Sequence, residues 1–125
     1  MIGLSYGSFY TLFTVACDTR INSSVACSQF NDCAKKIFVD WTWNNAALMF
    51  SDAEIACLVY PRRLCIEVGD NDEAFSYEDA KNEFNRLIKH CEGHSTDWVD
   101  FIVFSGNHKF HKDDMPIERL VNDIQ

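Results

Sequence analysis

The most constraining feature of this sequence is the pentapeptide Gly-Leu-Ser-Tyr-Gly at residues 3–7. It follows the apolar pair Met1 and Ile2 and precedes residues 8–17, which are apolar on nearly every helical face. This context predicts a strand, a sharp turn with Ser5 at its tip, and a helix. Small residues on either side of the turn would let the strand and the helix approach each other. On the pentapeptide alone, an ordinary turn or N-cap serine is an equally good interpretation of Ser5.

Composition excludes several classes of protein. The chain has 125 residues, of which 47% are hydrophobic and 24% charged, which is typical of one globular domain spanning residues 1–125. No apolar run approaches the ~20 residues that span a membrane, and no signal-peptide pattern is present. The net charge is −8 and no segment concentrates Lys and Arg. We therefore expect a cytoplasmic protein with neither a membrane nor a nucleic-acid partner.

The six cysteines form no C-x-x-C pair, and several have apolar neighbours. Without a secretion signal, reduced and mostly buried thiols are favoured over disulfides. Zinc-ligand spacing is absent, and the pair His108 and His111 is too isolated to indicate a metal site. We expect no metal and no cofactor.

Strand and helix signals alternate along the rest of the chain. Short apolar strands are predicted at residues 24–28, 64–68 and 100–104. Helices are predicted at 53–60 behind a cap at Ser51, at 76–91 behind a capping-box-like Ser76, and from Pro116 onward. Alternation of this kind predicts an α/β fold with about three parallel strands and flanking helices, in addition to the short strand before Ser5.

Polar residues follow three of these strands. They are Ser5, the pair Asp70 and Asp72, and His108, in that chain order. In open parallel sheets, reactive groups gather at the carboxyl ends of the strands. We therefore expect a serine, an aspartate and a histidine to lie along one edge of the sheet.

Three segments carry a resemblance to a known family: residues 3–7 (GLSYG), 61–72 (PRRLCIEVGDND) and 106–110 (GNHKF). Together and in this order they resemble the α/β-hydrolase superfamily, and within it the dienelactone-hydrolase and prolyl-oligopeptidase-like esterases. The resemblance covers essentially the whole chain, but it corresponds only to the C-terminal half of that fold.

The resemblance implies a role for each site residue. Ser5 would be the nucleophile, His108 its general base, and Asp72 the acid that orients the imidazole. Asp72 is preferred to Asp70 because it follows Gly69 by three residues, as the acid of the family does. His111 is the one serious rival to His108 as the base. The backbone N–H of Tyr6, which follows the nucleophile, would supply one oxyanion-hole donor.

Two further pairs have alternative interpretations. Trp41 and Trp43 could line a substrate pocket in the family context, although packing within the domain is the favoured interpretation. The pair Arg62 and Arg63 is expected to be surface charge at the entrance of a strand.

The half-match to the family has consequences for activity and assembly. The segment that normally supplies the second oxyanion donor would be missing, so we expect weak or no hydrolysis of a small-molecule ester. An uncovered sheet edge and an apolar first helix predict a homo-oligomer or a complementing N-terminal segment. A truncated, non-catalytic remnant of such a hydrolase is the alternative function.

Overall fold

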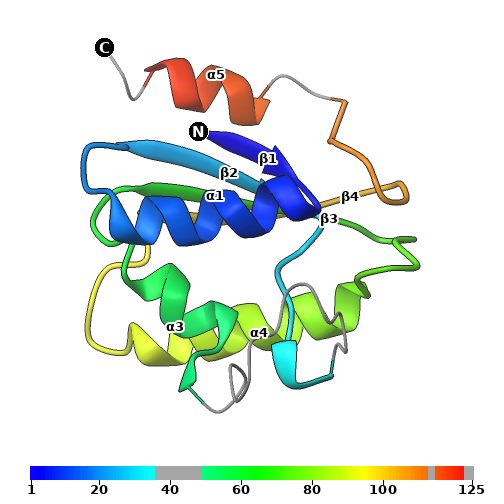
Figure 1. The fold of residues 1–125 in the computed structure, drawn as a ribbon, viewed down its shortest axis with the longest axis horizontal. Coiled ribbons are helices and arrows are strands. Elements are labelled where there is room, and N and C mark those ends of the chain that lie inside the picture. Colours follow the sequence, from blue (N-terminus) through cyan, green and yellow to red (C-terminus); the bar gives the residue numbers. More distant parts are fainter. Residues whose placement is uncertain (36–48, 113–114, 123–125) are drawn as a thin grey trace.

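A four-stranded parallel sheet is the centre of the molecule (Figure 1). The computed structural model describes residues 1–35, 49–112 and 115–122. The strands β1 (Ile2–Leu4), β2 (Ser23–Cys27), β3 (Arg63–Gly69) and β4 (Val99–Phe104) are neighbours in that order. The predicted α/β class with parallel strands is confirmed. The apolar stretch before Ser5 is itself a strand and lies at one edge of the sheet.

Helices cover both faces of the sheet. The core lies between one face and the helices α1 (Tyr6–Cys17), α3 (Asp52–Cys57) and α4 (Tyr77–His90). The helix α5 (Met115–Asn122) lies on the other side and packs against β2 (Figure 1). A short 3-10 turn, η1 (Cys33–Lys35), follows β2. The buried core includes Leu12, Val15, Ala26, Phe30, Ala53, Ala56, Val59, Leu64, Ile66, Leu87 and Val99.

The alternation of side chains along the strands separates two environments. Ala26 of β2 and Ile66 of β3 belong to the core beneath α1, α3 and α4. Their neighbours Cys27 and Glu67 therefore point to the opposite face, on the side of α5. Both are buried, with exposed fractions of 0% and 3%. The side-chain carboxylate of Glu67 is thus enclosed near the C-terminal end of β3.

The helix caps form as the sequence indicates. Ser51 Oγ accepts the N–H of Glu54 at 3.2 Å, and Glu54 Oε2 accepts the N–H of Ser51 at 2.7 Å. This reciprocal capping box begins α3. At α4, Ser76 Oγ accepts the N–H of Asp79 at 3.2 Å. The predicted start points of both helices are confirmed, but α3 ends at Cys57, before the expected residue 60.

The guanidinium of Arg62 holds the end of α1 to the start of β3. Its Nη1 donates to the carbonyl oxygens of Val15, Asp18 and Ile21 at 2.6, 3.0 and 3.1 Å. The last carbonyls of a helix have no intrahelical donors, so a cation there satisfies them. The interpretation of Arg62 as surface charge is therefore wrong, whereas Arg63 is exposed.

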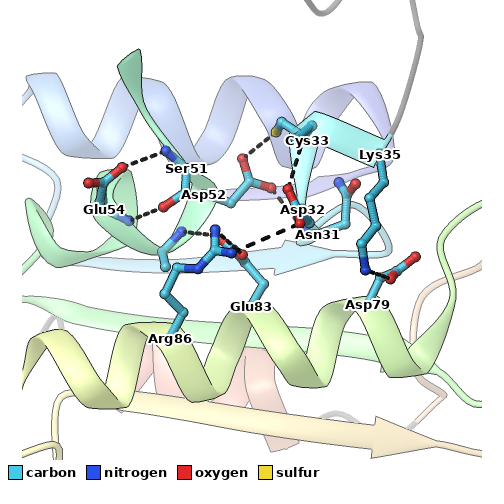
Figure 2. A network of polar contacts seen from close by, with 12 residues as sticks. Asn31, Asp32, Cys33, Lys35, Ser51, Asp52, Glu54, Asp79, Glu83 and Arg86 are labelled. Atoms are coloured by element: carbon cyan, nitrogen blue, oxygen red, sulfur yellow. Dashed lines mark hydrogen bonds and ion pairs between the residues drawn. The ribbon is translucent and has the colours of Figure 1, made fainter. Parts of the chain in front are cut away.

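Asp52, at the start of α3, is the centre of a buried polar network with the segment that follows β2 in the chain (Figure 2). Its carboxylate accepts from Gln29 Nε2 at 2.8 Å, the Asn31 N–H at 3.0 Å and Cys33 Sγ at 3.1 Å. Burial raises the pKa of Asp52 to about 7, although these donors act to lower it. The network fixes the segment that follows β2 against the start of α3.

Glu83 extends this network to α4. Its Oε1 accepts the N–H of Ala53 at 2.8 Å, and its Oε2 lies 3.0 Å from Arg86 Nη1 (Figure 2). Desolvation raises the pKa of this carboxyl above its usual value. The first turn of α3 is thereby joined to α4 through backbone and side-chain contacts.

The structure also shows the state of the cysteines and the character of the helices that it describes. All six cysteines are free thiols, and only Cys27 and Cys65 are buried, while Cys17 is exposed. Fewer are therefore buried than their apolar neighbours indicate. None of the helices described has the length and apolar character needed to cross a membrane.

Candidate active site

Ser5 lies on a strained turn between β1 and α1. Its φ and ψ are 56° and −116°, a region that residues other than glycine rarely adopt. Its N–H donates to the carbonyl of Cys27 at 3.0 Å, and its own carbonyl accepts the N–H of Phe9 at 3.0 Å. The side chain makes no capping hydrogen bond to α1. The backbone thus fixes the turn, and the hydroxyl is not used to cap the helix.

The two glycines around Ser5 have different roles. A Cβ at Gly3 would collide with the carbonyl of Gly7 and would lie 2.6 Å from Thr11 Oγ1. A Cβ at Gly7 would meet no heavy atom of the described residues within 4 Å. The close approach of strand and helix therefore requires Gly3. The prediction that both positions must be small is wrong for Gly7.

The structure brings Asp72 and His108 into direct contact. His108 Nδ1 lies 2.9 Å from Asp72 Oδ2, and the Asp72 side chain is fully buried. The other carboxylate oxygen accepts the N–H groups of Ala74 and Phe75 at 2.9 and 3.0 Å. The Phe75 ring stacks on the imidazole with centroids 5.8 Å apart. The carboxylate is therefore held in place by the backbone and directed at the histidine.

Asp70 has a different partner. Its Oδ1 accepts the N–H of Gly106 at 2.9 Å, and its own N–H donates to the carbonyl of Phe104 at 3.0 Å. A Cβ at Gly69 would lie only 2.5 Å from the Gly106 carbonyl oxygen, so the two loops are closely packed. Asp70 ties the turn after β4 to the end of β3, and the contact to His108 comes from Asp72.

His111 faces another carboxyl. Its ring stacks on Phe104 with centroids 5.0 Å apart. Its backbone N–H hydrogen bonds to the Glu67 carboxylate and its imidazole interacts with it electrostatically, and both act to lower the pKa of Glu67. Of the two histidines considered as the base, His108 is the one in contact with Asp72.

The remaining site residues are placed as follows. Tyr6 is the first residue of α1, where the N–H groups of a helix point out of its amino end. Its side chain is 41% exposed. Trp41 and Trp43 lie outside the described residues. No group of three or more His, Cys, Asp or Glu side chains suited to a metal ion occurs within the described ranges.

Sequence reasoning missed three residues at this edge: Cys27, Glu67 and Phe75. Glu67 gave a visible signal, because a carboxylate inside the apolar run 64–68 conflicts with a fully buried parallel strand. The apolar neighbours of Cys27 indicate only that this residue is buried, not that it contacts the histidine loop. Nothing in the local sequence marks Phe75 as the ring that stacks on His108.

Comparison with known proteins gives structural matches only. No protein-family model matches the chain, and no curated protein sequence matches it. A glucuronoyl esterase from Solibacter usitatus matches with a TM-score of 0.69 and 14% identity, over 98% of this chain and 41% of the esterase. An esterase from Pyrococcus furiosus matches with a TM-score of 0.63 and 17% identity, over 97% of this chain and 49% of that one.

An acyl-protein thioesterase from Zea mays has the same fold. Its TM-score is 0.59 at 16% identity, over 99% of this chain and 55% of the thioesterase. These identities are low, so the likeness concerns the fold. The chain spans between 41% and 55% of the length of these structures, and it carries part of the α/β-hydrolase fold.

Proposed function

We propose that this chain is a serine hydrolase of carboxylic esters, with Ser5 as nucleophile, His108 as general base and Asp72 as the orienting acid. The observation that carries the proposal is the 2.9 Å contact between His108 Nδ1 and the buried Asp72 carboxylate. It lies at the same end of the parallel sheet as the strained turn of Ser5, where the carboxyl ends of the strands meet. Strain at a turn between strand and helix, at the same end of a sheet as a histidine held by an acid, is typical of activated serines.

Asp72 sets the tautomer of His108 in this mechanism. An ionised carboxylate only accepts hydrogen bonds, so the proton of the neutral imidazole resides on Nδ1. Nε2 then has a free lone pair and takes the Ser5 proton as Oγ attacks the ester carbonyl. Asp72 also stabilises the imidazolium that results. The imidazolium returns the proton to the leaving alcohol, and the acyl group stays on Ser5.

Water completes the cycle. His108 Nε2 takes a proton from a water molecule, the hydroxide attacks the acyl-enzyme carbonyl, and Ser5 Oγ leaves with that proton. Each tetrahedral intermediate carries an oxyanion. The N–H of Tyr6 would stabilise it, since it follows the nucleophile at the amino end of α1. Ester and water are consumed, and acid and alcohol are produced.

The similar structures and the exposure of the two reactive side chains support the proposed substrate class. The two esterases and the thioesterase reported above support an activity on carboxylic esters. The resemblance of residues 3–7, 61–72 and 106–110 extends the proposal to small-molecule esters of the dienelactone-hydrolase or prolyl-oligopeptidase type. His108 is exposed and Ser5 is partly exposed, so a substrate in solution can reach both.

Ester hydrolysis tests the proposal. The initial rate with p-nitrophenyl acetate would be measured for the purified chain and for Ser5→Ala and His108→Ala. Matched controls are Ser95→Ala and His94→Ala, which change an exposed serine and an exposed histidine in the loop before β4. We expect both site variants to lose the rate above background and both controls to keep it. A rate that survives Ser5→Ala would refute the proposal.

The alternative function is a non-catalytic domain that assembles through its sheet edge. β1 pairs with β2 and lies at the end of the strand order, and the side chains of Met1 and Ile2 are each 44% exposed. We propose that this edge binds a second copy of the chain or a complementing segment by strand addition. Light scattering after gel filtration would show a dimer, and Ile2→Lys would convert it to a monomer.

A further inference from the structure

We propose that Cys27 and Glu67 are positioning residues that connect the Ser5 turn to the loop carrying His108. The inference rests on the proposed function for its catalytic consequence. The buried link itself, between the Ser5 turn and the loop after β4, is argued from the contacts of residues at the ends of β2 and β3. Neither residue touches the reacting atoms in the proposed mechanism.

Cys27 contacts both loops. Its carbonyl oxygen accepts the N–H of Ser5 at 3.0 Å, which fixes the start of the turn. Its Sγ donates to the carbonyl of Lys109, the residue after His108, at 3.3 Å. One residue at the end of β2 therefore holds the nucleophile turn through its backbone and the histidine loop through its side chain.

Glu67 strengthens this link from the next strand. It is the register partner of Cys27 in the parallel pair of β2 and β3. Its carboxylate lies beside the Cys27 thiol and the backbone N–H of His111, and both act to lower the pKa of Glu67. The single thiol proton is directed at the Lys109 carbonyl, so the N–H of His111 is the loop group that this carboxylate accepts. Cys27 thus contacts residue 109 and Glu67 contacts residue 111, one and three positions after His108.

The histidine is thereby anchored on both sides. Before it, Gly106 donates its N–H to Asp70 at 2.9 Å. After it, Cys27 and Glu67 contact the backbone of residues 109 and 111. Of these two anchors, only the second includes the Ser5 turn, so it joins the nucleophile turn to the loop that carries the base.

The protonation states suit this role. Burial raises the pKa of the Cys27 thiol to about 12, so at neutral pH it remains an S–H donor. Glu67 is buried, and this burial raises the pKa of its carboxyl, so the carboxylate is enclosed at a cost. An apolar residue would suit a buried parallel strand better. The carboxylate contributes what such a residue lacks, an acceptor for the N–H of the loop.

The test uses paired variants of the full chain. Glu67→Leu and Cys27→Ala remove the acceptor and the donor. Glu67→Gln and Cys27→Ser keep an acceptor oxygen and a donor hydrogen at the same places. Cys65→Ala is the control, because Cys65 is a buried thiol two residues before Glu67 on the same strand and face.

Two measurements are made on every variant. Amide hydrogen exchange of the segment that contains residues 108–112 reports whether the loop is held. Values of kcat and KM for p-nitrophenyl acetate report whether the geometry between Ser5 and His108 matters. The exchange measurement needs no activity, so it tests the link even if the chain hydrolyses no ester.

We expect Glu67→Leu and Cys27→Ala to speed exchange in this segment at least 10-fold. Because misplacement of about 1 Å costs roughly 10²-fold in rate, kcat should fall 10- to 100-fold with KM nearly unchanged. The Gln and Ser variants should recover most of both values, and Cys65→Ala should match the wild type. Unchanged exchange in Glu67→Leu and Cys27→Ala would overturn the inference. So would equal losses in Cys65→Ala, or Gln and Ser variants as impaired as Leu and Ala.

Discussion

Replacement of the two glycines around Ser5 by alanine separates the structure from the sequence pattern. In the pattern G-x-S-x-G both glycines are equivalent. In the structure, a Cβ at Gly3 collides with the carbonyl of Gly7, whereas a Cβ at Gly7 meets none of the described atoms within 4 Å. We therefore predict opposite effects for Gly3→Ala and Gly7→Ala.

The magnitudes follow from the contacts. At Gly3 the added Cβ lies 2.6 Å from Thr11 Oγ1, where ordinary contact begins near 3.4 Å, so α1 must shift by about 0.8 Å for this atom alone. The Gly7 carbonyl is closer and, as backbone, cannot rotate away. Overpacking of this kind destabilises by about 1–3 kcal/mol or more. Alanine in place of Gly7 stabilises the helix by about 0.5–1 kcal/mol.

Thermal unfolding followed by circular dichroism checks these values. An unfolding entropy of about 2.1 cal/mol/K per residue makes 1 kcal/mol correspond to roughly 4 °C for a chain of this length. Gly3→Ala should lower the Tm by roughly 4–12 °C, and Gly7→Ala should raise it by about 2–4 °C. A Gly7→Ala variant as destabilised as Gly3→Ala would refute the packing argument. So would a Gly3→Ala variant with the wild-type Tm.

Three further predictions follow from the contacts of charged residues. Asp72→Asn should lower the rate of ester hydrolysis by about 10³–10⁴-fold, because it favours the wrong tautomer of the His108 imidazole. Asp70→Asn should lose far less, because it keeps an oxygen for its backbone partner. Equal losses of rate in the two variants would contradict the pairing of Asp72 with His108. Arg62→Met should destabilise by about 2–4 kcal/mol in urea unfolding, because the carbonyls of Val15 and Ile21 lose their guanidinium donor. A loss no larger than that of Arg63→Met would count against this prediction. Because the pKa of Asp52 is raised to about 7, the folded state binds this proton more tightly than the unfolded state does. The free energy of unfolding, relative to that of Asp52→Asn, should therefore fall by about 1–4 kcal/mol between about pH 4 and about pH 7. Parallel curves of unfolding free energy against pH for the two proteins would show that the pKa of Asp52 is not raised by folding.

Local signals in the sequence predicted the sheet and most helices. A capping serine bonds to backbone groups only three residues away, so it can be recognised in the sequence. Ser51 and Ser76 therefore indicate the starts of their helices correctly. The carboxyl ends of parallel strands meet at one edge for geometric reasons, which is why Ser5, Asp72 and His108 could be assigned to the same edge.

Contacts between distant segments were not predictable in this way. The Arg62 guanidinium binds carbonyls more than 40 positions away in the chain. The link from Cys27 to Lys109 spans 82 positions. Each depends on the packing of helix against strand or loop, and a single sequence shows only the residue types. The buried Glu67 marked a conflict with its strand without showing which loop it binds.

Reaction of Ser5 with a fluorophosphonate probe, followed by intact-mass analysis, tests the central claim most directly. The account predicts one adduct on the wild-type chain, located on Ser5 by peptide mapping. It predicts no adduct on Ser5→Ala and a strongly slowed reaction of His108→Ala. A folded wild-type chain that stays unlabelled, or an adduct that persists in Ser5→Ala, would contradict the claim that this edge of the sheet is a hydrolase active site.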